Sequence, residues 1–173
     1  TTFAARSLMS YLNKFEIETS YGIKAWKRWG NTAEQIIKSN PYVLCIQGVD
    51  LSFSRADAVA AKSDIPADSE CRIKAGITYI LRQNADQGHT CLPLDSLVKT
   101  AVSYLDVDEK LIKKVIEDET EEENLYYYDK HGRRFVMLAD FYKAEDYIAR
   151  RLAIMRQISY DNKIDFSEVI DLE

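Results

Sequence analysis

Apolar side chains recur every three to four residues along the first half of the chain, the spacing that places them on one face of a helix. This period predicts five helices, over residues 3–14, 18–29, 32–39, 55–61 and 69–85. Gly30 ends the second helix, and Pro41 ends the third because the residue before a proline avoids helical backbone angles. Ser54 is the predicted cap of the fourth helix.

The second half combines helices with a hairpin. Helical spacing predicts helices over residues 94–105, from Asp108 onward, and over residues 140–159. Two β-prone runs before the last helix flank a short turn that contains Gly132, which is typical of a β-hairpin. Helix, helix, hairpin, helix is the order of a winged-helix module, with the hairpin as the wing. The predicted boundaries divide the chain into residues 1–87, 88–160 and a tail at 161–173.

The last predicted helix has apolar side chains on one side, which we expect to point inward. They are Phe141, Ala144, Ile148, Leu152 and Met155. Residues 164–170 have the pattern of a strand that pairs with something outside this chain. The chain also begins inside a predicted helix without an initiator methionine, so we expect it to be part of a longer protein.

Composition supports a mainly α fold. Hydrophobic residues make up 46% of the chain, and six glycines and three prolines leave little irregular structure. No apolar run approaches the roughly 18–20 residues needed to span a bilayer, so we expect no membrane association. The three cysteines form no CxxC pair, and with two histidines they exclude Cys/His zinc spacing. Their odd number suits a reducing cytoplasm.

Charge is unevenly distributed along the chain. Residues 1–60 carry seven basic and five acidic side chains, a net of +2, whereas residues 94–173 carry twelve and nineteen, a net of −7. A domain that binds duplex DNA through a broad basic face is usually net positive. Any nucleic-acid contact of this chain must therefore be local or weak.

Catalytic motifs are absent from the sequence. There is no GxxxxGK[ST] phosphate loop, and no GxSxG, HExxH or DFG pattern. The densest carboxylate run, Glu117–Glu123, is best explained as a solvated helix end. This chain is therefore expected to hold no cofactor and to catalyse no reaction by itself.

Four segments occur in a specific order between residues 40 and 93. They are Asn-Pro-Tyr-Val-Leu at 40–44, Phe-Ser-Arg-Ala-Asp-Ala-Val-Ala at 53–60, Arg-Ile-Lys-Ala-Gly-Ile-Thr-Tyr-Ile-Leu at 72–81 and Gly-His-Thr-Cys-Leu-Pro at 88–93. With Tyr142–Ala149, this order resembles the N-terminal region of RecD/TraA-family ATP-dependent DNA helicases, also known as the alpha subunit of exodeoxyribonuclease V. The resemblance covers about 110 of the 173 residues.

The resemblance implies a helical helix-hairpin-helix bundle followed by a winged-helix-like module, ahead of two motor domains. In that family the motor hydrolyses ATP with magnesium and moves 5′ to 3′ along single-stranded DNA, in recombination and repair. This chain has no motor motif, so ATP and magnesium are expected for the absent motor domains only. The resemblance thus implies a non-catalytic accessory DNA-binding region of a helicase in the bacterial cytoplasm.

The family's hairpin supplies the first candidate site. A helix-hairpin-helix binds phosphate because its glycines let backbone N–H groups face the anion. Here the two family glycines fall on Asp50 and Ser52. Either the hairpin has lost its DNA affinity, or Ser52, Ser54 and Arg55 contact phosphate, with Lys24, Lys27 and Arg28 nearby in sequence.

The predicted wing supplies the second candidate site. Lys130, Arg133 and Arg134 gather at its tip with His131, where they can lie along a phosphate backbone. Tyr127 is the tyrosine that we expect to stack on a base. Alternatively, two of the tyrosines at 126–128 pack and the basic tip offsets the nearby acidic run. Lys110, Lys113 and Lys114 mark the polar side of the helix before the wing.

The leading hypothesis is an accessory region that binds single-stranded or forked DNA weakly and docks on the motor domains of its own chain. The alternative is a protein-interaction module that docks on the motor domains or a partner subunit without contacting DNA. The acidic balance argues against a free-standing winged-helix transcription factor.

Overall fold

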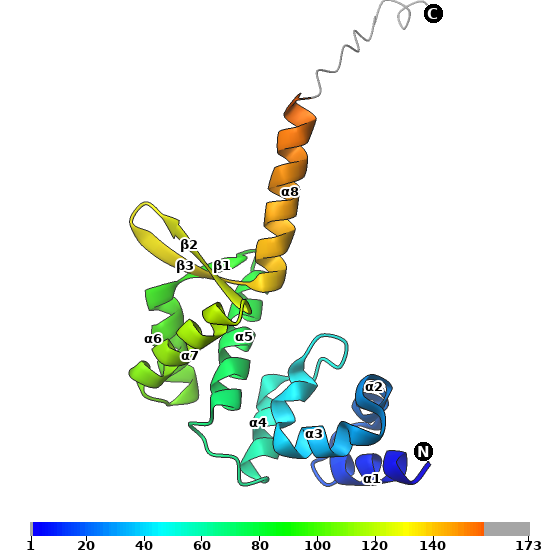
Figure 1. Cartoon of the computed structure of the whole chain (residues 1–173). Coiled ribbons are helices and arrows are strands. Elements are labelled where there is room, and N and C mark those ends of the chain that lie inside the picture. Colours follow the sequence, from blue (N-terminus) through cyan, green and yellow to red (C-terminus); the bar gives the residue numbers. More distant parts are fainter. Residues whose placement is uncertain (1, 158–173) are drawn as a thin grey trace, which may run out of the picture. The chain divides into compact units, whose positions relative to one another are not determined.

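A computed structural model of the chain describes residues 2–157, so the predicted tail at 161–173 lies outside the described residues. The chain divides into two compact units, Thr1–Ala139 and Asp140–Glu173. The mainly α fold is confirmed (Figure 1). The helices are α1 (Thr2–Asn13), α2 (Thr19–Trp29), η1 (Gly30–Thr32), α3 (Ala33–Ser39), η2 (Pro41–Cys45), α4 (Phe53–Ala61), α5 (Glu70–Asp86), α6 (Leu94–Leu105), α7 (Glu109–Glu121) and α8 (Ala139–Gln157). The strands are β1 (Cys91–Pro93), β2 (Leu125–Lys130) and β3 (Arg133–Leu138).

Helices α1, α2, α3 and η2 share one small apolar core. Its fully buried side chains include Leu8 and Leu12 of α1, Ile37 of α3 and Leu44 of η2. Helices α1 and α2 pack so closely that a Cβ added at Gly22 would lie 2.4 Å from the sulfur of Met9. This close approach explains why a glycine stands inside a helix, where it is otherwise unfavourable.

Helix α4 begins one residue before the predicted cap. Its N-cap residue is Ser52, in the extended conformation, and Ser54 lies in the first turn. The prediction of Ser54 as the cap was therefore wrong. Phe53 is buried in an aromatic cluster with Tyr42 and Tyr79, at ring-centroid distances of 5.6 and 5.7 Å, and this packing holds the start of the helix.

A half-buried ion pair joins η2, α4, α5 and the end of α6. Asp57 accepts two hydrogen bonds from Arg72, at 2.7 and 3.1 Å, and one from the hydroxyl of Tyr42 at 2.5 Å. Arg72 also donates to the carbonyl oxygens of Ala67 and Leu105, both at 2.8 Å. The family segments at 40–44, 53–60 and 72–81 thus meet in one hydrogen-bonded network that holds the fold.

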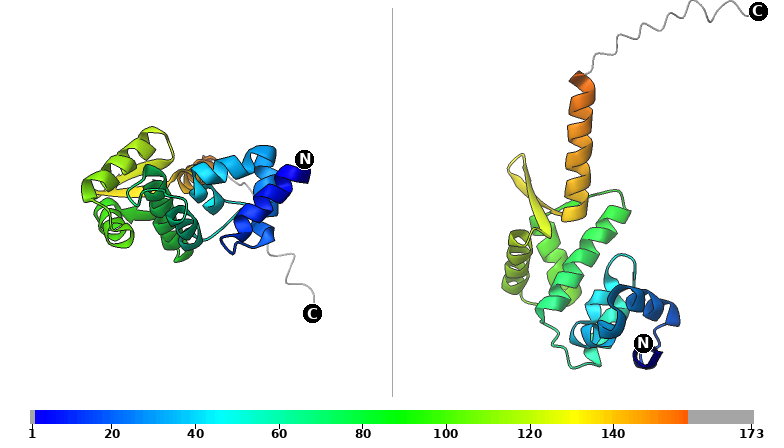
Figure 2. Two further views of the ribbon diagram at one scale, coloured as in Figure 1. Left: turned by 90° about the horizontal axis from the view of Figure 1, so that it is seen from below. Right: turned by 45° about the vertical axis from the view of Figure 1, so that its right-hand side comes forward.

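Helix α5 runs through the middle of the first unit, with α1–α4 on one side and α6 and α7 on the other (Figures 1 and 2). Gly76 permits its contact with α6, because a Cβ there would lie 2.6 Å from a methyl group of Leu105. The same helix therefore supports the packing on both sides. The boundary expected after residue 87 stays a prediction.

The elements from α5 onward follow the order α5, β1, α6, α7, β2, β3, and the sheet order is β1-β3-β2. Both strand pairs are antiparallel. The predicted cap of α7 is confirmed, because the Asp108 carboxylate accepts the backbone N–H of Lys110 at 2.7 Å. Strand β1 was not predicted, since three residues are too short to show an alternating pattern.

The β2–β3 hairpin turns over two residues, His131 and Gly132, whose φ angles are 50° and 73°. Positive φ at both positions matches the twist of the flanking strands and favours glycine at the second. The turn was predicted over residues 129–132, but the strands extend into that range, so that Asp129 pairs with Arg134 and Lys130 with Arg133.

Helix α8 buries none of its described residues. The expected inward burial of its apolar side is therefore wrong for the described structure. Ile148, Leu152 and Met155 are 55%, 55% and 52% exposed. They still share one side of the helix, since they follow at intervals of four and three residues.

Candidate nucleic-acid interface

The loop between η2 and α4, residues 46–52, satisfies its own backbone donors. The N–H groups of Val49 and Asp50 both donate to the carbonyl of Ile46, and that of Leu51 donates to the carbonyl of Leu44. The Gly48 N–H donates to the Asp50 carboxylate at 3.1 Å. Four successive N–H groups therefore point into the chain and not toward an external anion.

Asp50 supplies a negative charge at this loop. Its φ of 64° is in the left-handed region, where a non-glycine residue is uncommon but Asp is tolerated. Its second carboxylate oxygen lies 3.8 Å from the ammonium nitrogen of Lys24, which donates to the carbonyl of Val49 at 3.1 Å. The cation nearest the loop thus already faces a carboxylate.

Arg55 is held by the connection between α1 and α2. Its guanidinium donates to the Glu16 carbonyl at 2.7 Å and the Glu18 carboxylate at 3.2 Å, and lies 5.6 Å from the Tyr21 ring centre. The hydroxyls of Ser52 and Ser54 are exposed and 3.5 Å apart. The structure brings these three predicted residues together, but the cation is engaged within the fold.

Exposed cations also follow α2. Lys27 and Arg28 are exposed near its end, and Arg28 lies 5.8 Å from the Trp29 ring centre. They stand on the helix that carries Lys24, next to the 46–52 loop.

One face of the β2–β3 hairpin is internally neutralised. Side chains alternate across a strand, so Tyr127, Asp129, Arg134 and Val136 share a face that we call the closed face. Arg134 donates two hydrogen bonds to Asp129, at 3.0 and 3.2 Å. The hydrogen bond from Arg134 lowers the pKa of the Asp129 carboxyl. The same guanidinium lies 4.9 Å from the ring centre of Tyr127, close enough for a cation–π contact.

The opposite face of the hairpin is chemically different. Tyr128, Lys130, Arg133 and Phe135 share it, and we call it the open face. Lys130 and Arg133 are exposed and directly opposite each other, and neither forms an ion pair with any residue that the structure describes. Tyr128 is 47% exposed, and its ring centre lies 6.5 Å from that of Phe135.

Helix α7 carries three exposed lysines, and of these Lys110 and Lys114 form no ion pair with any described residue. Lys113 pairs with Glu109 at 2.6 Å, and this hydrogen bond raises the pKa of Lys113. Two members of the acidic run, Glu119 and Glu122, hold Lys74 of α5 at 2.9 and 3.5 Å. Part of the run expected to be a solvated face therefore ties α7 to α5.

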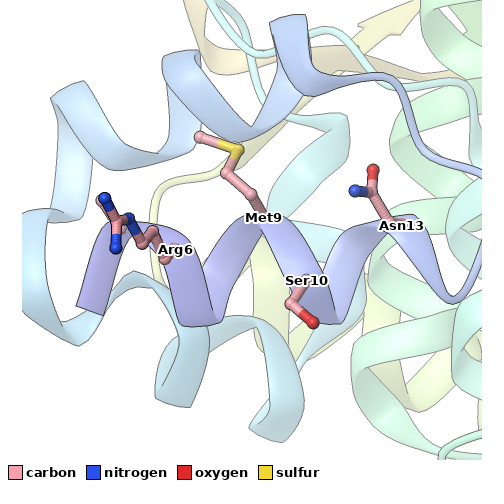
Figure 3. Close-up of a pocket in the computed structure, with 5 residues that line it drawn as sticks. Arg6, Met9, Ser10 and Asn13 are labelled. Carbon is pink, nitrogen blue, oxygen red and sulfur yellow. The ribbon is translucent and has the colours of Figure 1, made fainter. Parts of the chain in front are cut away.

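The hollow along α1 in Figure 3 shows no convergent chemistry. Arg6, Ser10 and Asn13 point in different directions, and Met9 packs toward Gly22 of α2. Within residues 2–157, no group of three or more His, Cys, Asp or Glu side chains could hold a metal ion. None of the described helices has the length and apolarity that crossing a membrane requires.

The predicted hairpin residues are thus divided between two faces. Lys130 and Arg133 lie on the open face, whereas Tyr127 and Arg134 lie on the closed face and contact each other. The aromatic side chain that accompanies the unpaired cations is Tyr128, and the predicted residue Tyr127 lies on the other face. Alternation along the strand places Tyr128 on the face of Lys130, and the two-residue turn at Gly132 places Arg133 opposite Lys130, so these two signals together could have identified Tyr128.

Residues 1–91 match the family model described as the ATP-dependent RecD2 DNA helicase HHH domain. The match includes the 46–52 loop and ends at the start of β1. The narrower expectation of an exodeoxyribonuclease V alpha subunit stays a prediction.

Proposed function

The chain belongs to the RecD2-type DNA helicase family through its helix-hairpin-helix domain at residues 1–91, and on this premise we propose that its β2–β3 hairpin contacts DNA. The domain identifies the chain as a helicase-associated accessory region. A contact with DNA would suit such a region, and the β2–β3 hairpin is the surface to which we assign it.

The observation that carries the proposal is the placement of Lys130 opposite Arg133. Like charges directly opposite each other destabilise a β-hairpin. No described carboxylate forms an ion pair with either of them, whereas Arg134 beside them is paired with Asp129. An arrangement that is unfavourable in the free chain becomes favourable once phosphate groups lie against it.

The 46–52 loop is the weaker candidate. Its backbone donors are used internally, Lys24 faces Asp50, and Arg55 is bonded to Glu16 and Glu18. A phosphate there would have to displace a carboxylate that is part of the chain. The family's own hairpin is therefore assigned a structural role here.

The remaining expectations follow from the family. We further propose that motor domains, whose motifs residues 1–173 lack, use ATP and magnesium in the parent protein, and that it acts in DNA recombination and repair in the bacterial cytoplasm. The accessory region presents single-stranded or forked DNA to those domains.

The test is a fluorescence-anisotropy titration of labelled forked and single-stranded DNA at low salt. We expect micromolar or weaker binding that falls with salt, because phosphate contacts release counterions. The double variant K130Q/R133Q should weaken binding about tenfold and reduce the single-strand salt slope by up to about 1.4, or about 0.7 for each phosphate. The matched control K14Q/K62Q removes two exposed lysines elsewhere and should bind like the wild type.

Two results would contradict the proposal. If the wild-type chain binds neither DNA at low salt, direct contact is excluded. If K14Q/K62Q weakens binding as much as K130Q/R133Q, the attraction is general and the hairpin is not the contact.

A second candidate function is docking on the motor domains or a partner subunit, and the observation that favours it is the exposed apolar side of α8. Ile148, Leu152 and Met155 would meet an apolar surface on the partner. A separately expressed motor fragment should co-purify with the chain and fail to do so with I148N/L152N. Capture that is unchanged by these substitutions would exclude α8 as the docking element.

A further inference from the structure

We infer that the open face of the hairpin binds single-stranded nucleic acid, with one unpaired base stacked on Tyr128 and the adjoining phosphates on Lys130 and Arg133. This inference rests on the proposed DNA contact and specifies its face, its ligand and its aromatic residue. It assigns Tyr128 a role in binding and leaves the closed face out of the contact.

The ring of Tyr128 is available to a base. It is 47% exposed, more than any other large hydrophobic side chain of the hairpin. Phe135, its cross-strand partner, lies at a ring-centroid distance of 6.5 Å and an interplanar angle of 50°. Phe135 supports the ring from the side without covering it as a parallel stacked ring would.

The cations lie one step further toward the tip. Tyr128 and Lys130 are two residues apart on one strand, which is about 6.7 Å along the strand direction. Arg133 lies directly across from Lys130, so the two charges lie at the same level of the hairpin. A step of this length is comparable with one nucleotide, so a base on Tyr128 places its neighbouring phosphate near both cations.

The closed face lacks both elements. The ring of Tyr127 is covered by the Arg134 guanidinium at 4.9 Å, and the charge of Arg134 is neutralised by Asp129. A base that stacked on Tyr127 would first have to break the cation–π contact. The two faces of one hairpin therefore differ in ring availability and in net charge.

Charge and stacking together favour single strands over duplex. Duplex DNA presents a dense row of phosphates, which proteins usually meet with many cations, whereas the open face offers two in a chain of net charge −5. Aromatic stacking needs a base face that is not already covered by a neighbouring base pair, and single strands supply it. The two positive charges of the open face are thus sufficient to bind a nucleic acid only when base stacking adds to the attraction.

The experiment compares Y128A, Y128F, Y127A and the wild-type chain on three labelled probes. The probes are an oligothymidylate strand, an abasic strand of the same length and a duplex of the same length. We expect Y128A to lose about tenfold in affinity for oligothymidylate, the size of one stacked base, and to bind the abasic strand like the wild type. Y128F keeps the ring and should retain wild-type affinity, and Y127A should change little.

Each outcome has one interpretation. If Y128A and Y127A both bind oligothymidylate like the wild type while K130Q/R133Q is weaker, the stacking inference fails and the proposed hairpin contact survives. If the wild type binds the abasic strand or the duplex as tightly as oligothymidylate, the preference for unpaired bases is wrong. If it binds no probe, the proposed function itself fails. Circular dichroism of each variant checks that the substitution, Tyr128→Ala above all, leaves the fold intact.

Discussion

Two arginine–aspartate pairs of nearly the same geometry stand in different regions of the chain. Arg72 holds Asp57 with bonds of 2.7 and 3.1 Å, and Arg134 holds Asp129 with bonds of 3.0 and 3.2 Å. The side chains of the first pair are 15% and 29% exposed, and those of the second are 51% and 62% exposed. The local chemistry is alike, and the surroundings differ.

The difference in exposure distinguishes side chains that stabilise the fold from side chains that are available to bind a ligand. Around Asp57, Tyr42 and two backbone carbonyls complete a network that joins four elements, so the Arg72 guanidinium is engaged within the fold. At the hairpin, the Asp129 pair neutralises one face only, and Lys130 and Arg133 on the other face stay without a described partner. The family segments thus maintain the structure, and the proposed contact lies outside them.

The largest expected effect is on the half-buried pair. D57N removes the carboxylate that neutralises Arg72, and we expect a loss of about 2 kcal/mol in the free energy of unfolding, because a partly buried charge loses its partner. Urea denaturation measures the loss. The matched variant D129N breaks the same kind of pair on the exposed hairpin and should leave stability unchanged. If D57N and D129N lose equal free energy of unfolding, the two pairs do not differ in their contribution to stability.

The next effect is on acid stability. Burial alone would raise the pKa of the Asp57 carboxyl, but hydrogen bonds from Arg72 and Tyr42 and the charge of Arg72 lower it below its usual value. A lowered folded-state pKa stabilises the fold above the unfolded value of about 3.9, and this contribution is lost as pH falls through the folded-state pKa.

Urea midpoints measured from pH 6 to pH 3 should therefore fall less steeply for D57N than for the wild type, relative to their values at pH 6. D129N should follow the wild-type curve, since water screens its exposed pair. A D57N curve parallel to the wild type would show that Asp57 does not contribute to the acid response.

A smaller effect, on DNA affinity, tests the 46–52 loop. D50G removes the carboxylate that accepts the Gly48 N–H and faces Lys24, and glycine suits the φ of 64° at this position. We expect DNA affinity to rise by about fivefold. This gain is somewhat smaller than the one that a full charge-assisted hydrogen bond to a phosphate would bring.

D64G is the matched control, because Asp64 is also exposed and has a positive φ of 56°. It should raise DNA affinity much less than D50G, and K24Q added to D50G should cancel the gain. If D64G and D50G gain equally, the effect is one of net charge and the loop has no specific anion position.

The smallest effect concerns the stability of the hairpin. K130Q/R133Q removes two like charges that face each other, so the free energy of unfolding should rise by no more than about 0.5 kcal/mol. Thermal unfolding at low salt measures this change. A clear loss of stability would show that Lys130 or Arg133 holds the fold, which would weaken their assignment to binding.

The periodic patterns predicted most of the elements. Helical spacing placed α5 within one residue of its ends, and Gly132 located the hairpin turn, because both signals depend on neighbours in sequence. The site was only partly predictable. Lys130 and Arg133 were selected from sequence, whereas the choice between Tyr127 and Tyr128 depended on the hairpin register, which placed the Arg134 guanidinium over Tyr127.

By itself, the sequence determined the mainly α fold, the hairpin and the absence of a phosphate loop from residues 1–173. Only the tertiary structure decided which cations are engaged. Arg55 meets a glutamate 37 residues away, and Arg72 donates to a carbonyl 33 residues away, so neither partner is visible in local spacing. An ion pair forms where packing brings its members within a few ångströms, and packing is a property of the whole core. The same packing leaves Lys130 and Arg133 at a hairpin tip, where neither forms an ion pair with a described carboxylate.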